Sequence, residues 1–173
     1  VGLIDGTNLI NTVDKFFTEE DRKDIENAIL RNIDELVNNI LSQNSLTFND
    51  IQKIGVSTPG TVIDGKIRSS NLDLNFFDLK TALEEKYKLP VKIRNDGKCA
   101  ALAEKKYGVM KDYNDCIFVN IGTGVGGAAF IDGKLLEPKR FSGFEFGHMI
   151  IEKDGVSSTD AVLYSVLDIC VDS

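Results

Sequence analysis

The stretch NIGTGVGGAAFIDG at residues 120–133 decides which class of fold this chain adopts. Its glycines match the G-x-G-x-x-G spacing of a dinucleotide-binding loop, which requires a helix directly after the glycines. Four residues separate Gly127 from the pair Asp132-Gly133, which is too short for that helix. Asp-Gly is instead a common two-residue hairpin turn. The stretch therefore predicts a strand, a turn and a second strand, and the dinucleotide interpretation fails.

A glycine-rich hairpin can still bind phosphate. Without Cβ atoms the backbone can approach an anion closely, and successive N–H groups can converge on it. A hairpin whose glycines serve backbone geometry alone is the alternative. Four glycines in six residues exceed what a two-residue turn needs, so the pattern favours phosphate. The candidate residues are Gly122, Thr123, Gly124, Gly126 and Gly127.

Outward from this stretch, strands and helices alternate after an opening strand pair within 1–17, which predicts an α/β class with a mixed sheet. The expected helices span 19–43 (capped by Thr18 and Asp21), 76–88 and 97–108. The further expected strands lie in 51–60, 61–69 (a hairpin turning at Asp64-Gly65), 90–96, 115–121 and 126–137. The segment 108–115 lacks apolar periodicity, so we expect an N-terminal lobe over 1–112 and part of a C-terminal lobe over 113–173.

Charge and composition narrow the function class. The net charge of −7 and the pI near 4.8 argue against a nucleic-acid surface, which is usually basic. No apolar run approaches a membrane span, and the N-terminus does not read as a signal peptide. Cys99, Cys116 and Cys170 are odd in number and widely spaced, which fits neither a disulfide framework nor a C-x-x-C metal site. We expect a cytoplasmic protein with reduced thiols.

Asn95 and Asp96 stand where an expected strand meets an expected helix. Both residue types are preferred helix caps, and a carboxylate there complements the helix dipole. The functional alternative makes Asp96 a general base for phosphoryl transfer to an alcohol, with Asn95 as an orienting partner. The segment by itself leaves both interpretations open, with capping slightly favoured.

GFEFGHM at 143–149 carries Glu145 and the single histidine, His148. At i and i+3 the two would share a face of a helical turn, and Gly147 would let a ligand come close. A lone histidine is more often structural than ligand-binding. With Glu145 nearby, the structural and the ligand-binding interpretations of His148 are about equally favoured.

Taken together, the motifs resemble the ROK family of bacterial sugar kinases and sugar-responsive repressors, within the actin/hexokinase-like superfamily. The resemblance runs from residue 1 to about 155. Each motif is weak alone, but their order and spacing make the match specific. The motifs are IGVSTPGTVIDGKI (54–67), NLDL (71–74), LPVKIRNDGKCAALAEKKYG (89–108), NIGTGVGGAAFIDGKLL (120–136) and GFEFGHM (143–149).

The resemblance implies an actin-like, ribonuclease H-like ATPase fold and an ATP-dependent kinase, working with Mg²⁺, that phosphorylates a hexose or N-acetylhexosamine. It implies Asp96 as the catalytic base and a phosphate loop at 122–127. Sugar contacts would come from Asn71, Asn95, Asp96, Glu145 and His148. A homodimer is an expected assembly, and neither nucleic acid nor membrane is an expected partner.

Two departures from the family shape the remaining expectations. The first strand and first phosphate loop have no counterpart here, because Asp5-Gly6-Thr7 sits where the family has a turn. Of the zinc ligands that usually follow the histidine segment, this chain supplies Cys170 alone, so we expect no zinc. We expect this chain by itself to be an inactive fragment of a kinase. The alternatives are a sugar-binding transcriptional regulator of the same family and a degenerate, non-catalytic relative.

Overall fold

The computed structural model describes residues 1–122, 124–137 and 146–150, without the side chain of His148. The chain forms two compact units, Val1–Ile93 and Arg94–Ser173. The N-terminal unit contains three helical segments of more than one turn, and its strands pair in three small sheets, β1–β2, β3–β7 and β4–β5–β6. Its elements are β1 (Gly2–Asp5), β2 (Asn8–Thr12), α1 (Glu19–Lys23), α2 (Ile25–Gln43), η1 (Phe48–Asp50), β3 (Ile54–Thr58), β4 (Thr61–Ile63), β5 (Lys66–Ser69), β6 (Leu74–Phe77), α3 (Leu79–Tyr87) and β7 (Val91–Asn95), whose last two residues enter the second unit.

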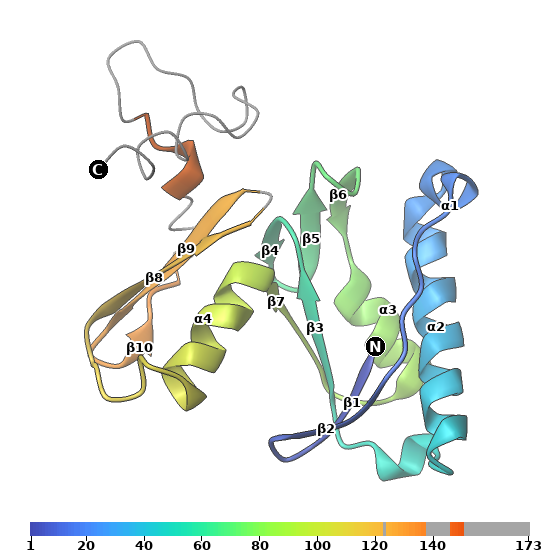
Figure 1. The fold of residues 1–173 in the computed structure, drawn as a ribbon. Coiled ribbons are helices and arrows are strands. Elements are labelled where there is room, and N and C mark those ends of the chain that lie inside the picture. Colours follow the sequence, from blue (N-terminus) through green and yellow to red (C-terminus); the bar gives the residue numbers. More distant parts are fainter. Residues whose placement is uncertain (123, 138–145, 151–173) are drawn as a thin grey trace. The chain divides into compact units, whose positions relative to one another are not determined.

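The core of the first unit joins its helices to its strands. Figure 1 shows α2 beside β6 and α3 beside β5. Helix α2 supplies Ile29 to this core. The buried apolar residues of the cluster are Ile29, Ile67, Leu74, Leu79, Leu83, Tyr87, Val91 and Ile93. Burial of this kind is the main force that holds helix and sheet together.

Two details of the first unit differ from expectation. The predicted helix over 19–43 is interrupted at Asp24, whose φ of −144° and ψ of 68° are not helical. The predicted helix over 76–88 begins at Leu79, because the residues before it form β6, which pairs with β5. Phe76 lies in a bulge of that pairing with φ of 59°. Strand β6 was missed because this bulge interrupts the alternation by which a strand is recognised in a sequence.

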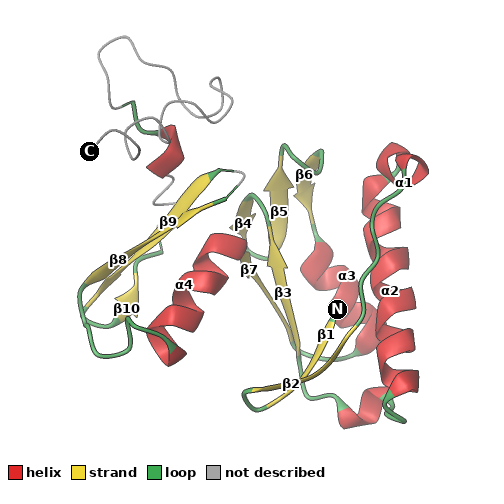
Figure 2. Ribbon diagram, viewed as in Figure 1, coloured by secondary structure: helices red, strands yellow, loops and turns green. Residues whose placement is uncertain are grey.

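The second unit packs one helix on one three-stranded antiparallel sheet, ordered β10–β9–β8 (Figure 2). Its described elements are α4 (Asp96–Tyr107), β8 (Cys116–Ile121), β9 (Val125–Ile131), β10 (Lys134–Leu135) and η2 (Phe146–His148). The core consists of Ala101, Met110, Ala128 and Phe130. The strand–turn–strand predicted at 120–133 is confirmed, and so is the α/β class.

The lobe boundary expected at 112/113 stays a prediction. The compact units divide ahead of α4, because this helix packs against β9. Within the described part of the chain, the helices lack the combination of length and hydropathy that a membrane crossing requires.

Candidate functional site

At the start of α4, Asn95 and Asp96 take different roles, which the sequence did not distinguish. Asn95 is the helix cap: its Oδ1 accepts a hydrogen bond from the Lys98 amide nitrogen at 3.1 Å. Asp96 is the first residue of the helix, and its side chain is exposed. The Asp96 Oδ1 accepts from the amide of Gly97 at 2.8 Å. The carboxylate therefore lies at the positive end of the helix dipole, while the neighbouring amide satisfies the cap.

The glycines of the β8–β9 loop fall into two pairs. A Cβ on Gly122 or Gly124 would meet nothing within 4 Å, and both residues are exposed. The loop is closed by the Gly122 amide, which donates to the Gly124 carbonyl at 2.9 Å. These two glycines thus leave open backbone at the tip of the hairpin, where an anion could approach. Thr123 lies outside the described residues.

The second pair of glycines makes room for side chains of the protein itself. A Cβ on Gly126 would lie 2.8 Å from the Asn120 Oδ1. On Gly127 it would overlap the Phe146 ring, 2.2 Å from its nearest atom. Packing therefore accounts for Gly126 and Gly127 without any ligand, and the open part of the predicted phosphate loop is its first half.

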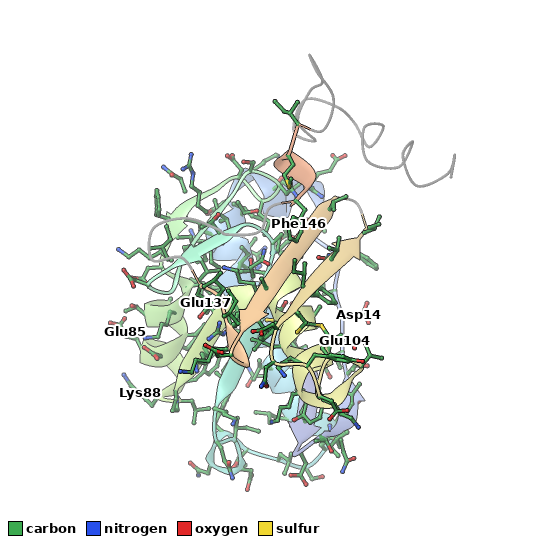
Figure 3. All side chains as sticks on the ribbon, turned by 90° about the vertical axis from the view of Figure 1, so that its left-hand side faces the viewer. Asp14, Glu85, Lys88, Glu104, Glu137 and Phe146 are labelled. Carbon is green, nitrogen blue, oxygen red and sulfur yellow. The ribbon has the colours of Figure 1, made fainter. Side chains whose placement is uncertain are left out.

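Phe146 brings the histidine-bearing segment to the sheet. Its ring covers Gly127, so the short helix η2 lies against β9 (Figure 3). The backbone of His148 belongs to η2, whereas its side chain and all of Glu145 lie outside the described residues. The segment that carries these two predicted sugar contacts thus joins the unit that also holds Asp96 and the glycine loop.

An ion pair connects the residue before the α4 cap to the segment that follows β10. The guanidinium of Arg94, directly before the cap Asn95, pairs with the carboxylate of Glu137, which lies two residues after the end of β10 and is labelled in Figure 3. The pair links the strand that leads into α4 to the sheet on which α4 packs. Both side chains are partly exposed, so its contribution to stability is modest.

Asn71 belongs to the first unit, where it is exposed in the turn between β5 and β6. The structure thus gathers Asn95, Asp96, the glycine loop and η2 in the second unit, with Asn71 in the other. Among the residues that the structure describes, no three His, Cys, Asp or Glu side chains gather as a metal site would require. The zinc expectation, which concerned His148 and Cys170, lies outside the described side chains.

Asn120 was not among the site residues expected from the sequence. Along β8 the half-buried side chains are Cys116, Phe118 and Asn120, which alternate with exposed neighbours. A Cβ on Gly97 would lie 3.2 Å from the Asn120 Oδ1, so this amide lies beside the start of α4 as well as beside Gly126. A polar residue on the inward face of an otherwise apolar strand was the signal available in the sequence.

Comparison with known proteins identifies relatives of both functional kinds. The chain is 41% identical over 114 residues to a beta-glucoside kinase from Listeria monocytogenes, covering 61% of this chain and 37% of that protein. It is 38% identical over 106 residues to the xylose repressor of Bacillus subtilis, covering 59% of this chain and 27% of the repressor. The chain thus spans well under half the length of these relatives.

Solved structures resemble the fold. One is a putative N-acetylmannosamine kinase from Listeria monocytogenes, with TM-score 0.60, 38% identity and coverage of 70% of this chain and 42% of that one. Another is a ROK family glucokinase from Streptomyces griseus in complex with glucose and AMPPNP, with TM-score 0.59 and 28% identity. The matched region covers 79% of this chain and 43% of the glucokinase chain. The expected actin-like kinase fold is thereby confirmed.

The family model for ROK proteins matches residues 2–159, which is nearly the whole chain and the range over which the motifs were recognised. This chain belongs to the ROK family.

Proposed function

We propose that the protein carrying this chain is an ATP-dependent kinase of a hexose or N-acetylhexosamine hydroxyl, with Asp96 as its general base. The observation that carries the proposal is the division of roles at the start of α4. Asn95 caps the helix, so Asp96 is not needed as a cap and presents an exposed carboxylate at a helix N-terminus. The kinases among the relatives support this reading.

In the proposed reaction, the Asp96 carboxylate takes the proton of a sugar hydroxyl. The hydroxyl oxygen then forms a bond to the γ-phosphorus of ATP, and the bond from that phosphorus to the bridging oxygen breaks. ADP leaves with the electron pair, and the phosphorylated sugar remains. The carboxylate lies at the N-terminal, positive end of the α4 dipole, where the Gly97 amide donates to its Oδ1.

The tip of the glycine hairpin is the proposed phosphate contact. Gly122 and Gly124 have open space where a Cβ would stand, so an ATP phosphate could come close to the backbone at this tip. A Mg²⁺ ion bound with the nucleotide would neutralise charge on the transferred group. Such an ion takes few protein ligands beside phosphate and water. The remaining proposed sugar contacts are Asn71, Asn95, Glu145 and His148.

The proposal is tested by sugar-dependent ADP release from the complete protein. The assay couples ADP to NADH oxidation and scans glucose, a β-glucoside, N-acetylmannosamine and xylose at fixed Mg-ATP. We expect one or two hexoses to raise ADP release far above the rate without sugar. Uniform rates across all sugars, equal to the rate without sugar, would contradict the kinase assignment.

A sugar-binding regulator is the second candidate, because the identity to a xylose repressor nearly equals the identity to the kinase. The discriminating measurement is isothermal titration with the same sugars. Binding of a sugar that produces no ADP release would favour the regulator. A kinase is favoured when the sugar that binds is also the sugar that is phosphorylated.

A further inference from the structure

Asn120 is the described side chain that lies between the two functional elements of the second unit. It extends from β8, and its amide oxygen borders both Gly97 in the first turn of α4 and Gly126 at the start of β9. Gly97 in turn donates its amide hydrogen to the Asp96 carboxylate. The Asn120 amide therefore lies between Gly97, whose N–H contacts the proposed base, and β9, the strand that follows the proposed phosphate loop.

Two glycines on separate elements make room for this one amide. A Cβ at position 126 would be 2.8 Å from the Asn120 Oδ1. A Cβ at position 97 would be 3.2 Å from the same atom and 3.3 Å from the Oδ1 of the cap Asn95. Gly97 is also buried within a helix, where glycine is less favourable than alanine. The Asn120 amide thus explains the glycine at 126, and together with the cap Asn95 it explains the glycine at 97.

The amide itself is not explained by packing. The Asn120 Oδ1 is buried and has no hydrogen-bond partner among the residues that the structure describes. A buried acceptor without a donor is destabilising, and an apolar side chain of the same size would avoid that cost. The place of this amide beside the candidate base gives it a reason to be retained.

We propose that Asn120 is a positioning residue that sets the distance between the Asp96 carboxylate and the glycine loop. This inference rests on the proposed kinase function. By filling the space between Gly97 and Gly126, the amide keeps the start of α4 and the start of β9 at one separation. The acceptor hydroxyl and the γ-phosphate are then held at the separation that transfer requires, a distance to which such reactions are sensitive.

The kinetic test replaces Asn120 with leucine, which has a similar volume and no amide, in the complete protein. We expect kcat to fall about 10- to 100-fold, with the KM for sugar and the melting temperature nearly unchanged. In the Asp96→Asn background the same substitution should cause little further loss, because a residue that acts through Asp96 has nothing left to position. Asn8→Leu, an exposed asparagine on strand β2, is the control and should retain full activity.

A second test examines the geometry without any turnover. Gly97→Ala should lower the melting temperature, because its Cβ would crowd the Asn120 amide. In an Asn120→Ala background the same Gly97→Ala change should cost less, because one of the two close oxygens is gone, the Asn95 Oδ1 at 3.3 Å remains, and alanine favours the helix. An equal penalty in both backgrounds would overturn the inference that glycine is there for the amide.

The outcomes separate this inference from the proposed function. Wild-type protein without sugar-dependent ADP release would overturn the kinase assignment, and with it any role of Asn120 in transfer. Active wild type together with an unchanged kcat in Asn120→Leu would overturn the role of Asn120 alone. Losses that multiply between Asn120→Leu and Asp96→Asn would show that Asn120 does not act through the base, which also contradicts the inference.

Discussion

Helices α3 and α4 begin with the same hydrogen bond made by different residues. Asp78 caps α3, where its Oδ1 accepts from the Thr81 amide at 3.1 Å. Asn95 caps α4 in the same way, accepting from the Lys98 amide at 3.1 Å. In α3 the carboxylate is used as the cap, whereas in α4 a neutral amide is the cap and the carboxylate stands one position later.

The difference shows how to interpret an acidic residue at a helix start. A carboxylate that caps its helix is explained by that bond, as Asp78 is. A carboxylate beside a cap that is already satisfied requires another explanation, as Asp96 does. The two helices thus serve as a matched pair, one structural and one proposed as functional, and the following predictions test the contrast.

The largest effect is expected for Asp96→Asn. If Asp96 is the base, kcat should fall by roughly 10² to 10⁴, the usual contribution of general acid–base catalysis. The KM for sugar and the melting temperature should change little, because asparagine still forms hydrogen bonds and the cap is Asn95. Steady-state kinetics of the complete protein measure this, with Asp78→Asn as the matched control that keeps its activity. Near-normal turnover in Asp96→Asn would contradict the assignment of Asp96 as the base. The starts of α3 and α4 would then show no difference in function.

Gly124→Val is expected to act on the nucleotide. A Cβ at this position meets no described atom within 4 Å, so the fold should tolerate the side chain, while the open backbone at the hairpin tip becomes blocked. We expect the KM for ATP to rise roughly tenfold, equivalent to about 1.4 kcal/mol of binding. Gly55→Val, on β3 with equally open surroundings, is the control. An unchanged KM for ATP and an unchanged melting temperature would reduce the loop to a plain hairpin.

Asp78→Ala should lower the melting temperature and leave kcat unchanged, which is the opposite of the result expected for Asp96→Asn. Loss of a helix cap costs about 1 kcal/mol, which lowers the melting temperature by roughly 4–8 °C for a unit of this size. Turnover at temperatures well below melting should stay unchanged. Circular dichroism melting and the ADP assay on the same samples test this. A loss of kcat without a loss of stability would break the contrast between α3 and α4.

The smallest effect concerns pH. The hydrogen bond from the Thr81 amide holds the pKa of the Asp78 carboxyl below its usual value of 3.8. A lowered pKa in the folded state means that the charged cap stabilises the fold above the unfolded-state pKa. This stabilisation disappears as the pH falls through the folded-state pKa. The difference in melting temperature between wild type and Asp78→Asn should therefore shrink or change sign on acidification from about pH 6 to pH 3. A difference that is constant over this range would contradict it.

Features that depend on a few neighbouring residues were predictable from the sequence. Both Asp-Gly turns form as expected, with φ of 50° and 83° at Asp64 and Gly65, and 50° and 72° at Asp132 and Gly133. The capping pair of Thr18 and Asp21 also forms, with both reciprocal bonds present. Each of these is decided by bonds that span two or three residues, so the sequence pattern contains all the partners.

Features that depend on distant partners were decided by the tertiary structure. Strand β3 (Ile54–Thr58) pairs with β7 (Val91–Asn95), which follows it only after three further strands and a helix. Asn120 and Gly97 are 23 positions apart in the sequence but adjacent in space, and no local pattern relates them. The four glycines look alike in sequence, yet Asn120 and Phe146 occupy the space beside two of them.

The sequence by itself therefore determined the class of fold, the turns, the family and Asp96 as the candidate base. The tertiary structure decided which of two adjacent residues caps α4, which glycines stay open and which amide lies between them. The physical reason is range: turns and caps are closed by bonds between near neighbours, whereas exposure and packing depend on side chains that the fold brings from elsewhere in the chain.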